Sequence, residues 1–246
     1  MIETNRQKCT INSVNHFIEE FMVTAPYRDK LREVYHKSYA QLFQDMFVLW
    51  YLDFKRDGYF VEFGATDGIE ISNTYLLEKD YGWNGIVAEP AKVWHEKLSN
   101  NRKCHIDTNC VWHSSNQFIT FDEAQHPERS MIQSFVNEDD HILRGNSTLY
   151  QVPCISLNDL LTKYNAPVDI DFISLDTEGS ELDILKAFDF DKYKVKFIAC
   201  EHNDETEVKG YRQPIYDLLS SKGYDRIWTH LSAQDDWYVL KEYNKI

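Results

Sequence analysis

The hydrophobic positions of this chain follow two different periods, one before residue 57 and one after it. Between about residues 11 and 56, apolar side chains recur three or four positions apart. The clearest groups are Phe17, Ile18, Phe21 and Met22, and then Leu42, Met46, Leu49 and Trp50. That spacing is typical of one face of an α-helix. We therefore predict a helical N-terminal cap over residues 1–57, followed by a single compact domain over residues 58–246.

After residue 57, short apolar runs alternate with amphipathic segments. The runs cover residues 59–63, 85–88, 104–112, 170–175 and 195–200. Segments 93–98 and 181–188 between them have helical spacing. Strands that alternate with helices favour βαβ units, in which the helices cover both faces of a mostly parallel sheet. The pattern predicts an α/β fold with a Rossmann-like sheet.

The end of the chain departs from this alternation. Runs 224–230 and 237–240 are separated only by the short segment 231–236, which leaves no room for a crossover helix. Two such strands pair antiparallel. A parallel sheet that ends in an antiparallel hairpin is typical of class I methyltransferases and less so of dehydrogenases.

The region from about residue 113 to 153 has the least regular pattern. It contains one strand-like run, 117–121, and a polar run at 137–140. We predict that this region is an insertion near the mouth of the binding site, and we expect the polar run to be solvated.

Composition narrows the classes of partner. The formal net charge is −14, from 26 basic and 40 acidic residues. Phosphate contacts need clustered lysine and arginine, so nucleic acid and anionic membranes are disfavoured as partners.

The five cysteines form no CxxC pair, which favours buried free thiols in a reducing compartment. No transmembrane run or apolar leader is present, and we expect a cytoplasmic protein. The sequence does not indicate an oligomeric state.

The stretch GYFVEFGATDG (58–68) carries the first candidate chemistry. Gly64 permits a sharp turn after the strand, and Gly68 is expected to allow a ligand to approach closely. The turn is not GxGxxG, so a pyrophosphate site is poorly supported. Glu89 ends the next apolar run, where a carboxylate can accept hydrogen bonds from both ribose hydroxyls of an adenosine. Glu62 and Asp67 would face a cationic cofactor such as S-adenosylmethionine, whereas they would repel a pyrophosphate.

With these motifs in order, the chain from Ser38 to Val239 resembles the FkbM family of S-adenosylmethionine-dependent methyltransferases. The matching segments are SYAQLFQDMFVL (38–49), GYFVEFGATDGIEISNTYLLEK (58–79), GWNGIVAEP (82–90), NNRK (100–103), IDFISLDTEGSELDILKAFDF (170–190), FIACEHN (197–203) and DDWYV (235–239). The resemblance implies a class I methyltransferase fold and methylation of hydroxyl groups, often on sugars of glycans or on natural products.

The resemblance also implies a set of cofactor contacts. Those at the turn and the ribose are Glu62, Gly64, Ala65, Asp67, Gly68 and Glu89. Gln41, Gln44 and Asp45 are expected to close over the methionine end. Backbone N–H groups of Ser72 and Asn73, at the start of the next helix, are expected to hold the cofactor carboxylate or simply to cap that helix. Asn109 and Cys110 are expected to border the adenine.

Acidic residues at two later strand ends are candidates for the chemistry. Asp176 and Glu178 stand two residues apart where one strand ends, and Glu201-His202-Asn203 closes the next. Any of three groups can accept the proton of an acceptor hydroxyl, and we rank Asp176 first, then His202, then Glu201. A zinc site is disfavoured because the histidines lack ligand spacing. Mg²⁺ held by Asp176 and Glu178 is a minority alternative.

We therefore expect an S-adenosylmethionine-dependent O-methyltransferase that acts on a sugar or glycan hydroxyl by in-line displacement. One alternative is a nicotinamide-dependent sugar oxidoreductase, but the chain lacks both GxGxxG and a Tyr-xxx-Lys pair at Tyr35, Tyr39 and Tyr193. The other alternative is a catalytically silent subunit that binds an adenosyl ligand or a glycan. The identity of the acceptor is not predicted.

Overall fold

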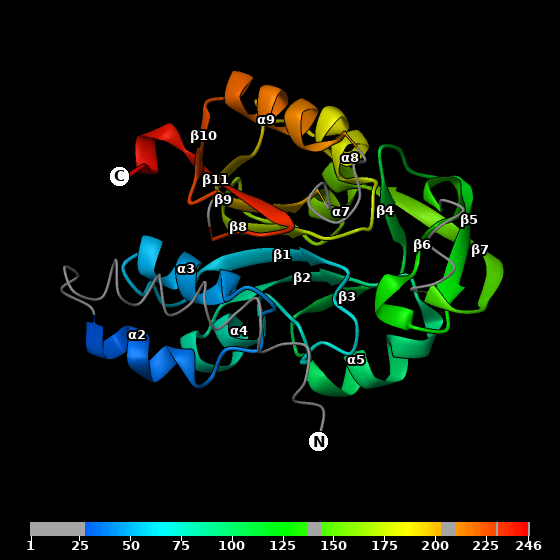
Figure 1. The fold of residues 1–246 in the computed structure, drawn as a ribbon, viewed down its shortest axis with the longest axis horizontal. Coiled ribbons are helices and arrows are strands. Elements are labelled where there is room, and N and C mark those ends of the chain that lie inside the picture. The colour runs from blue at the N-terminus through cyan, green and yellow to red at the C-terminus, as the bar shows by residue number, and fades with distance from the viewer. Residues whose placement is uncertain (1–27, 137–143, 203–209, 230, 246) are drawn as a thin grey trace.

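A seven-stranded sheet forms the centre of the computed structural model, which describes residues 28–136, 144–202, 210–229 and 231–245 (Figure 1). The strand order is β10-β11-β9-β8-β1-β2-β3. The strands are β1 (Tyr59–Phe63), β2 (Asn84–Ala88), β3 (His105–Asp107), β8 (Asp169–Leu175), β9 (Lys194–Glu201), β10 (Tyr224–Ile227) and β11 (Asp235–Leu240). The predicted helix around Phe17–Met22, the polar run 137–140 and Asn203 lie outside the described residues.

The sheet has the predicted mixture of strand directions. Five adjacent strands run parallel to one another, in the order β3, β2, β1, β8 and β9. Strand β11 is antiparallel to both β9 and β10. The hairpin predicted at the end of the chain is therefore confirmed, and β11 rather than β10 joins it to β9. The α/β prediction with a mostly parallel sheet is also confirmed.

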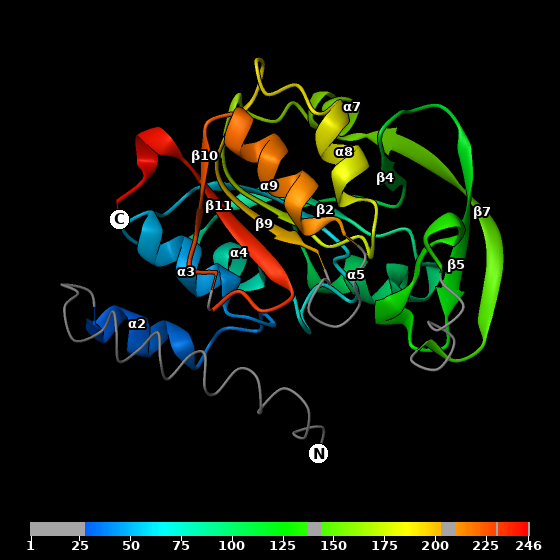
Figure 2. The ribbon, with the colours of Figure 1, turned by 45° about the horizontal axis from the view of Figure 1, so that its top comes forward.

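Helices cover both faces of this sheet (Figures 1 and 2). One face carries α2 (Arg28–Tyr35), α3 (Gln44–Tyr51), α4 (Tyr75–Tyr81) and α5 (His95–Asn101), and the other carries α7 (Leu157–Lys163), α8 (Glu181–Ala187) and α9 (Arg212–Ser221). Short 3₁₀ turns lie at η1 (Lys92–Trp94), η2 (Pro127–Arg129), η3 (Gln133–Phe135) and η5 (Lys241–Tyr243). None of the helices in the described parts of the chain is long and apolar enough to cross a bilayer.

The alternation of side chains along the central strands explains the two apolar cores. Phe60 of β1 and Phe172 of β8 are register partners and pack with α3 and α4. Their neighbours Val61 and Ile173 point to the other face and pack with α7 and α8. Each fully buried side chain of this kind contributes about 1.5–3 kcal/mol to folding. Strands buried on both faces read as continuous apolar runs, which is why they were recognisable in the sequence.

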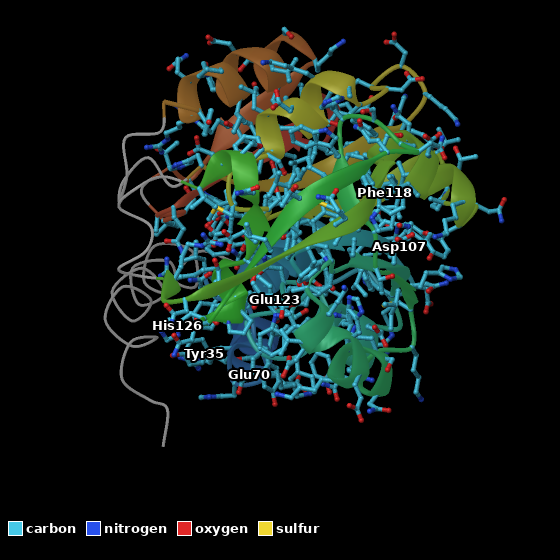
Figure 3. All side chains as sticks on the ribbon, turned by 90° about the vertical axis from the view of Figure 1, so that its right-hand side faces the viewer. Tyr35, Glu70, Asp107, Phe118, Glu123 and His126 are labelled. Atoms are coloured by element: carbon cyan, nitrogen blue, oxygen red, sulfur yellow. The ribbon has the colours of Figure 1, made fainter. Side chains whose placement is uncertain are left out.

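A second, four-stranded sheet lies at one end of the molecule, and only one of its strands, predicted over 117–121, was expected from the sequence. Its order is β4-β7-β5-β6, with β4 (Cys110–Trp112), β5 (Phe118–Ala124), β6 (Met131–Ile132) and β7 (Ser147–Ser156). Figure 3 faces this sheet, and the labels Phe118 and Glu123 mark the length of β5. Part of the region interpreted as irregular, 113–153, therefore forms regular antiparallel structure.

The single strand predicted over 104–112 was wrong. It divides into β3, which belongs to the central sheet, and β4, which pairs with β7 in the second sheet. The cause is local: Asp107 Oδ1 accepts hydrogen bonds from the backbone N–H and the side-chain amide of Asn109. Such a side-chain turn redirects the chain between the two sheets.

Candidate active site

The carboxyl ends of β1, β2 and β8 meet the second sheet around a pocket that is partly open to solvent. Ligands of open α/β sheets bind beyond this edge. The residues that line the pocket from the central sheet are Phe63, Gly64, Thr66, Ile71, Ala88, Glu89, Pro90, Asp176, Thr177, Glu178 and Ser180. The second sheet and its loops add Cys110, Val111, Phe121, Pro127, Glu128, Ser130 and Ile132. The structure thus brings Gly64, Glu89, Cys110 and Asp176 into one cavity.

Gly64 occupies a position that no other residue fits. Its φ is +70°, and a Cβ added there would lie 2.3 Å from the backbone oxygen of Asp176. The glycine therefore lets the ends of β1 and β8 approach each other, which brings Asp176 to the edge of the pocket.

Glu89 is a buried carboxylate that is held in place by the backbone. Oε2 accepts a hydrogen bond from Thr66 N at 2.9 Å, and Oε1 accepts one from Ala91 N at 2.8 Å. Burial raises the pKa of Glu89 to about 7, although these two hydrogen bonds lower it. The side chain is 4% exposed and lines the pocket, so its remaining lone pairs are available to a ligand with paired hydroxyl groups. Its predicted contact with the ribose stays a prediction.

This raised pKa predicts a pH dependence of ligand binding. Ribose hydroxyls donate to the ionised carboxylate, so binding favours deprotonated Glu89 and weakens as the pH falls below 7. We expect the affinity for S-adenosylhomocysteine, measured by calorimetry, to drop about tenfold from pH 8 to pH 6. Glu89→Gln should bind weakly at both pH values and show a flat profile. An equally flat profile in the wild-type protein would remove Glu89 from the ribose contact.

Glu62 does not line the pocket, contrary to its expected position beside the cofactor. Its carboxylate accepts hydrogen bonds from Ser72 Oγ, Asn73 N and Thr74 Oγ1 and forms an ion pair with Arg102 at 3.3 Å. All of these groups are buried. Because its oxygens are already occupied, Glu62 organises the segment after the turn and does not face a cationic ligand.

The glycine and aspartate that follow in the turn are also used internally. Asp67 Oδ1 accepts hydrogen bonds from Ile69 N and Glu70 N. A Cβ at Gly68 would lie 2.7 Å from Arg102 Cγ and from Leu98 Cδ1. The close approach that Gly68 permits is therefore to α5 and its end, not to a ligand.

The segment before α4 differs from the expected anion site in the same way. The helix begins at Tyr75, later than predicted, and the N–H groups of Ser72 and Asn73 already donate to Ile69 O and Glu62. They are not available to a cofactor carboxylate. The Asn73 side chain offers another contact: Nδ2 donates to Ser174 Oγ, while Oδ1 is buried and accepts no hydrogen bond from the residues described.

The remaining predicted cofactor residues lie in different environments. Ala65 is fully buried beside Gly64, whereas Gln41 is exposed. Asn109 turns the chain after Asp107, while Cys110 lines the pocket.

Two of the predicted methionine-end residues lie in α3. Gln44 is buried and donates to Asp235 Oδ2 at 2.8 Å, and Asp45 accepts from Ser38 Oγ and Met46 N. None of the residues Ala65, Gln41, Gln44, Asp45 or Asn109 lines the pocket itself.

Three carboxylates meet at the strand ends, and we call Asp176, Glu178 and Glu201 the acidic cluster. One oxygen of each lies within 4.8 Å of the others. Asp176 and Glu178 follow β8, and Glu201 ends the neighbouring β9, so the parallel pairing of these strands produces the cluster. Burial, followed by the neighbouring acids, raises the pKa of Asp176 and of Glu201 well above the usual range. Crowded buried acids of this kind are typical of functional sites.

His202 lies away from this cluster. Its Nε2 is 3.8 Å from Asp236 Oδ1, and Asp236 in turn accepts hydrogen bonds from Arg212 and Arg226. His202 does not line the pocket, whereas Asp176 does. Of the three predicted proton acceptors, Asp176 lines the pocket, whereas His202 and Glu201 do not.

The sequence interpretation missed the second sheet's contribution to the pocket. Phe121 and Ile132 form part of an apolar wall opposite the strand ends, and Pro127, Glu128 and Ser130 extend it. An alternating pattern of apolar residues in 147–156, now β7, was the signal that this region is folded.

A comparison with protein-family profiles identifies the family of this chain. The profile of the methyltransferase FkbM domain matches residues 62–226, more than half of the chain. A search of curated proteins gave no match.

Among solved structures, the precorrin-6y C5,15-methyltransferase of Geobacter metallireducens GS-15 is 11% identical over 79% of this chain and 85% of its own, with a TM-score of 0.40. The human methyltransferase 10 domain containing protein is 12% identical over 80% of each chain, with a TM-score of 0.39. The plantazolicin methyltransferase BpumL, solved in complex with SAH, is 11% identical over 96% of this chain and 98% of its own, with a TM-score of 0.38.

Proposed function

The chain belongs to the FkbM family of S-adenosylmethionine-dependent methyltransferases, and from this we propose that its acceptor is a hydroxyl group of a saccharide or glycan. The observation that carries the proposal is the composition of the pocket. The pocket contains Glu89, the carboxylate expected to bind the ribose, together with Asp176 and Glu178, the two carboxylates that follow β8.

The lining of the pocket fits an adenosyl cofactor. Glu89 offers oriented oxygens to the ribose, and Pro90, Val111 and Ile132 offer apolar surface to the base. Asn73 is not among the residues that line the pocket, but its unoccupied Oδ1 is a buried acceptor suited to an ammonium group. A bound S-adenosylmethionine would supply an electrophilic methyl group on its sulfonium, and the carboxylates nearby would favour that positive charge.

The acidic cluster supports a hydroxyl as the nucleophile. Positioning the acceptor oxygen in line with the methyl carbon can supply about 7–11 kcal/mol of barrier reduction. A hydroxyl at neutral pH also needs help to lose its proton, which typically adds about 10²–10⁴-fold. The cluster can give this help as a base, through Asp176, or as the ligand set of a cation that lowers the pKa of the hydroxyl. In either case the acceptor hydroxyl lies against Asp176.

Charge favours an acceptor without phosphate or carboxylate groups at the reacting end. Besides Glu89, the pocket presents Asp176, Glu178 and Glu128. These groups accept hydrogen bonds from sugar hydroxyls and repel anions.

A screen of neutral oligosaccharides, glycosides and sugar nucleotides with methyl-labelled S-adenosylmethionine tests the proposal. We expect transfer to at least one acceptor, with the product identified as a methyl ether by mass spectrometry and NMR. Methylation at nitrogen or carbon, in place of oxygen, would refute the hydroxyl proposal. Tight binding of S-adenosylhomocysteine without transfer to any acceptor would instead favour a silent binding subunit.

A further inference from the structure

The acidic cluster contains a buried carboxylate oxygen that no donor satisfies. The Glu201 side chain is 8% exposed, and its Oε2 accepts no hydrogen bond from any described residue. The side chain next to it, Asp176, is also a carboxyl group. When both groups are ionised, neither can donate a hydrogen bond to the other. A buried acceptor in this condition has lost its hydration without gaining a donor, which destabilises the fold, and more so if the acceptor is charged. Some further group is expected to satisfy it.

Two other buried acids nearby show the contrast. Glu181 Oε1 accepts hydrogen bonds from Thr177 N, Thr177 Oγ1 and Gly179 N. Asp235 Oδ2 accepts one from Gln44 Nε2. The fold therefore provides donors for these two acids, whereas Glu201 Oε2 receives none from the described residues.

Ion pairs at the other buried acids of the central sheet provide a second contrast. In the described ranges, no lysine or arginine forms an ion pair with Asp176 or Glu201, although most other buried carboxylates of the central sheet have such a partner, as Glu62 and Asp171 do. The four acids Asp176, Glu178, Glu181 and Asp235 all raise the energy of an ionised Glu201. Either protons or a cation must compensate this charge.

We infer that the acidic cluster binds a divalent cation of the Mg²⁺ type at the edge of the cofactor pocket. Its ligands would be one oxygen each from Asp176, Glu178 and Glu201, whose mutual distances of up to 4.8 Å suit a single ion. Hard oxygen donors without histidine or cysteine select Mg²⁺ or Mn²⁺ over Zn²⁺. Three protein ligands leave positions for water or for a substrate hydroxyl.

The position of the site suggests its use, and this part of the inference rests on the proposed function. Asp176 and Glu178 line the pocket, so a cation between them would lie where the acceptor hydroxyl is expected. Coordination of the hydroxyl oxygen would favour its deprotonated form and hold it for attack on the methyl carbon. The cation and the proton compete for the same carboxylate oxygens.

Mn²⁺ is the probe for the site, titrated into the whole protein after treatment with EDTA and its removal. At pH 7.5 we expect electron paramagnetic resonance to show one bound Mn²⁺ per chain, displaced by excess Mg²⁺. Glu201→Gln and Asp176→Asn should each weaken binding at least tenfold. Asp183→Asn in α8, whose side chain is 42% exposed, is the matched control and should bind like the wild type.

A second measurement locates the ion without using turnover. Bound Mn²⁺ should broaden the NMR lines of S-adenosylhomocysteine in the wild-type complex but not in the Glu201→Gln complex. Absence of stoichiometric Mn²⁺ binding below about millimolar concentration, or binding that neither variant weakens, overturns the cation site.

The cation site and the proposed function fail separately. If Mn²⁺ binds as expected and no hydroxyl is methylated, the acceptor proposal is wrong and the cation site stands. If a hydroxyl is methylated equally well in EDTA by a protein that binds no Mn²⁺, the cation site is wrong and the acceptor proposal stands.

Discussion

Asp176→Asn is expected to abolish most methyl transfer while leaving cofactor binding intact. The substitution keeps the shape of the side chain but removes the charge that assists loss of the hydroxyl proton, directly or through a cation. We expect kcat to fall about 10²–10⁴-fold. The dissociation constant for S-adenosylhomocysteine should stay within about threefold, because that ligand carries no acceptor hydroxyl. Single-turnover assays with labelled donor and calorimetry with S-adenosylhomocysteine measure the two quantities.

Stability separates this result from simple damage to the fold. Asp176 is crowded by Glu178, Glu181 and Asp235, so loss of its charge should leave the melting temperature of the ligand-free protein unchanged or raise it. Residues selected for function often cost stability in this way. Asp183→Asn, on the exposed side of α8, should change neither kcat nor ligand affinity. A fully active Asp176→Asn enzyme would exclude the residue from the chemistry.

The central sheet could be predicted because its information is local. Each strand buried on both faces appears as an apolar run, and each run is bounded by a turn or an amphipathic segment. The run 59–63 matches β1, and runs 170–175 and 195–200 fall within β8 and β9. The acids that follow β8 were recognised for the same reason, since a strand end can be located from the chain itself.

The second sheet is harder to predict because its strands are half-buried and pair with segments far away in the chain. In β7, only Val152, Cys154, Ile155 and Ser156 are buried, while residues such as Leu149 and Pro153 face outward. Proline in a strand normally argues against it. Pro153 is tolerated near the end of the pairing with β5, opposite Phe118. Long-range pairing thus outweighed the local signal.

The prediction of cofactor-binding residues was wrong where a side chain interacts with a residue far away in the sequence. Glu62 and Asp67 stand at a glycine turn, and their charge suited a cationic cofactor. Whether an acid faces the pocket depends on the side chains that surround it in the fold. Glu62 forms an ion pair with Arg102 at the end of α5, forty positions later in the chain. Glu89 has only backbone donors and faces the cavity. The sequence shows that Glu62 lies within an apolar run and that Glu89 ends one, but it does not show that only Glu62 has an arginine partner.

Arg102 is therefore expected to be among the most important residues for stability, although no chemistry requires it. Its side chain is fully buried, and its guanidinium bonds Glu78 at 2.6 Å, Thr74 Oγ1 at 2.8 Å and Glu62 at 3.3 Å. Arg102→Met would remove the buried cation that pairs with Glu62 and leave the buried Glu62 carboxylate without that counter-charge. We expect the free energy of unfolding to fall by about 3–5 kcal/mol. Urea denaturation monitored by circular dichroism measures the loss.

A double-variant cycle distinguishes an unpaired charge from a cavity. Adding Glu62→Gln to Arg102→Met removes the uncompensated charge, so the double variant should regain part of the stability that the single variant loses. A cavity alone would make the two losses additive. Lys37→Met breaks the exposed pair with Asp80 and should leave unfolding almost unchanged, because solvent already screens that pair. Because the same network fixes the segment that positions Asn73, the Arg102 variant should also bind S-adenosylhomocysteine more weakly, and a double variant that recovers stability should recover affinity with it.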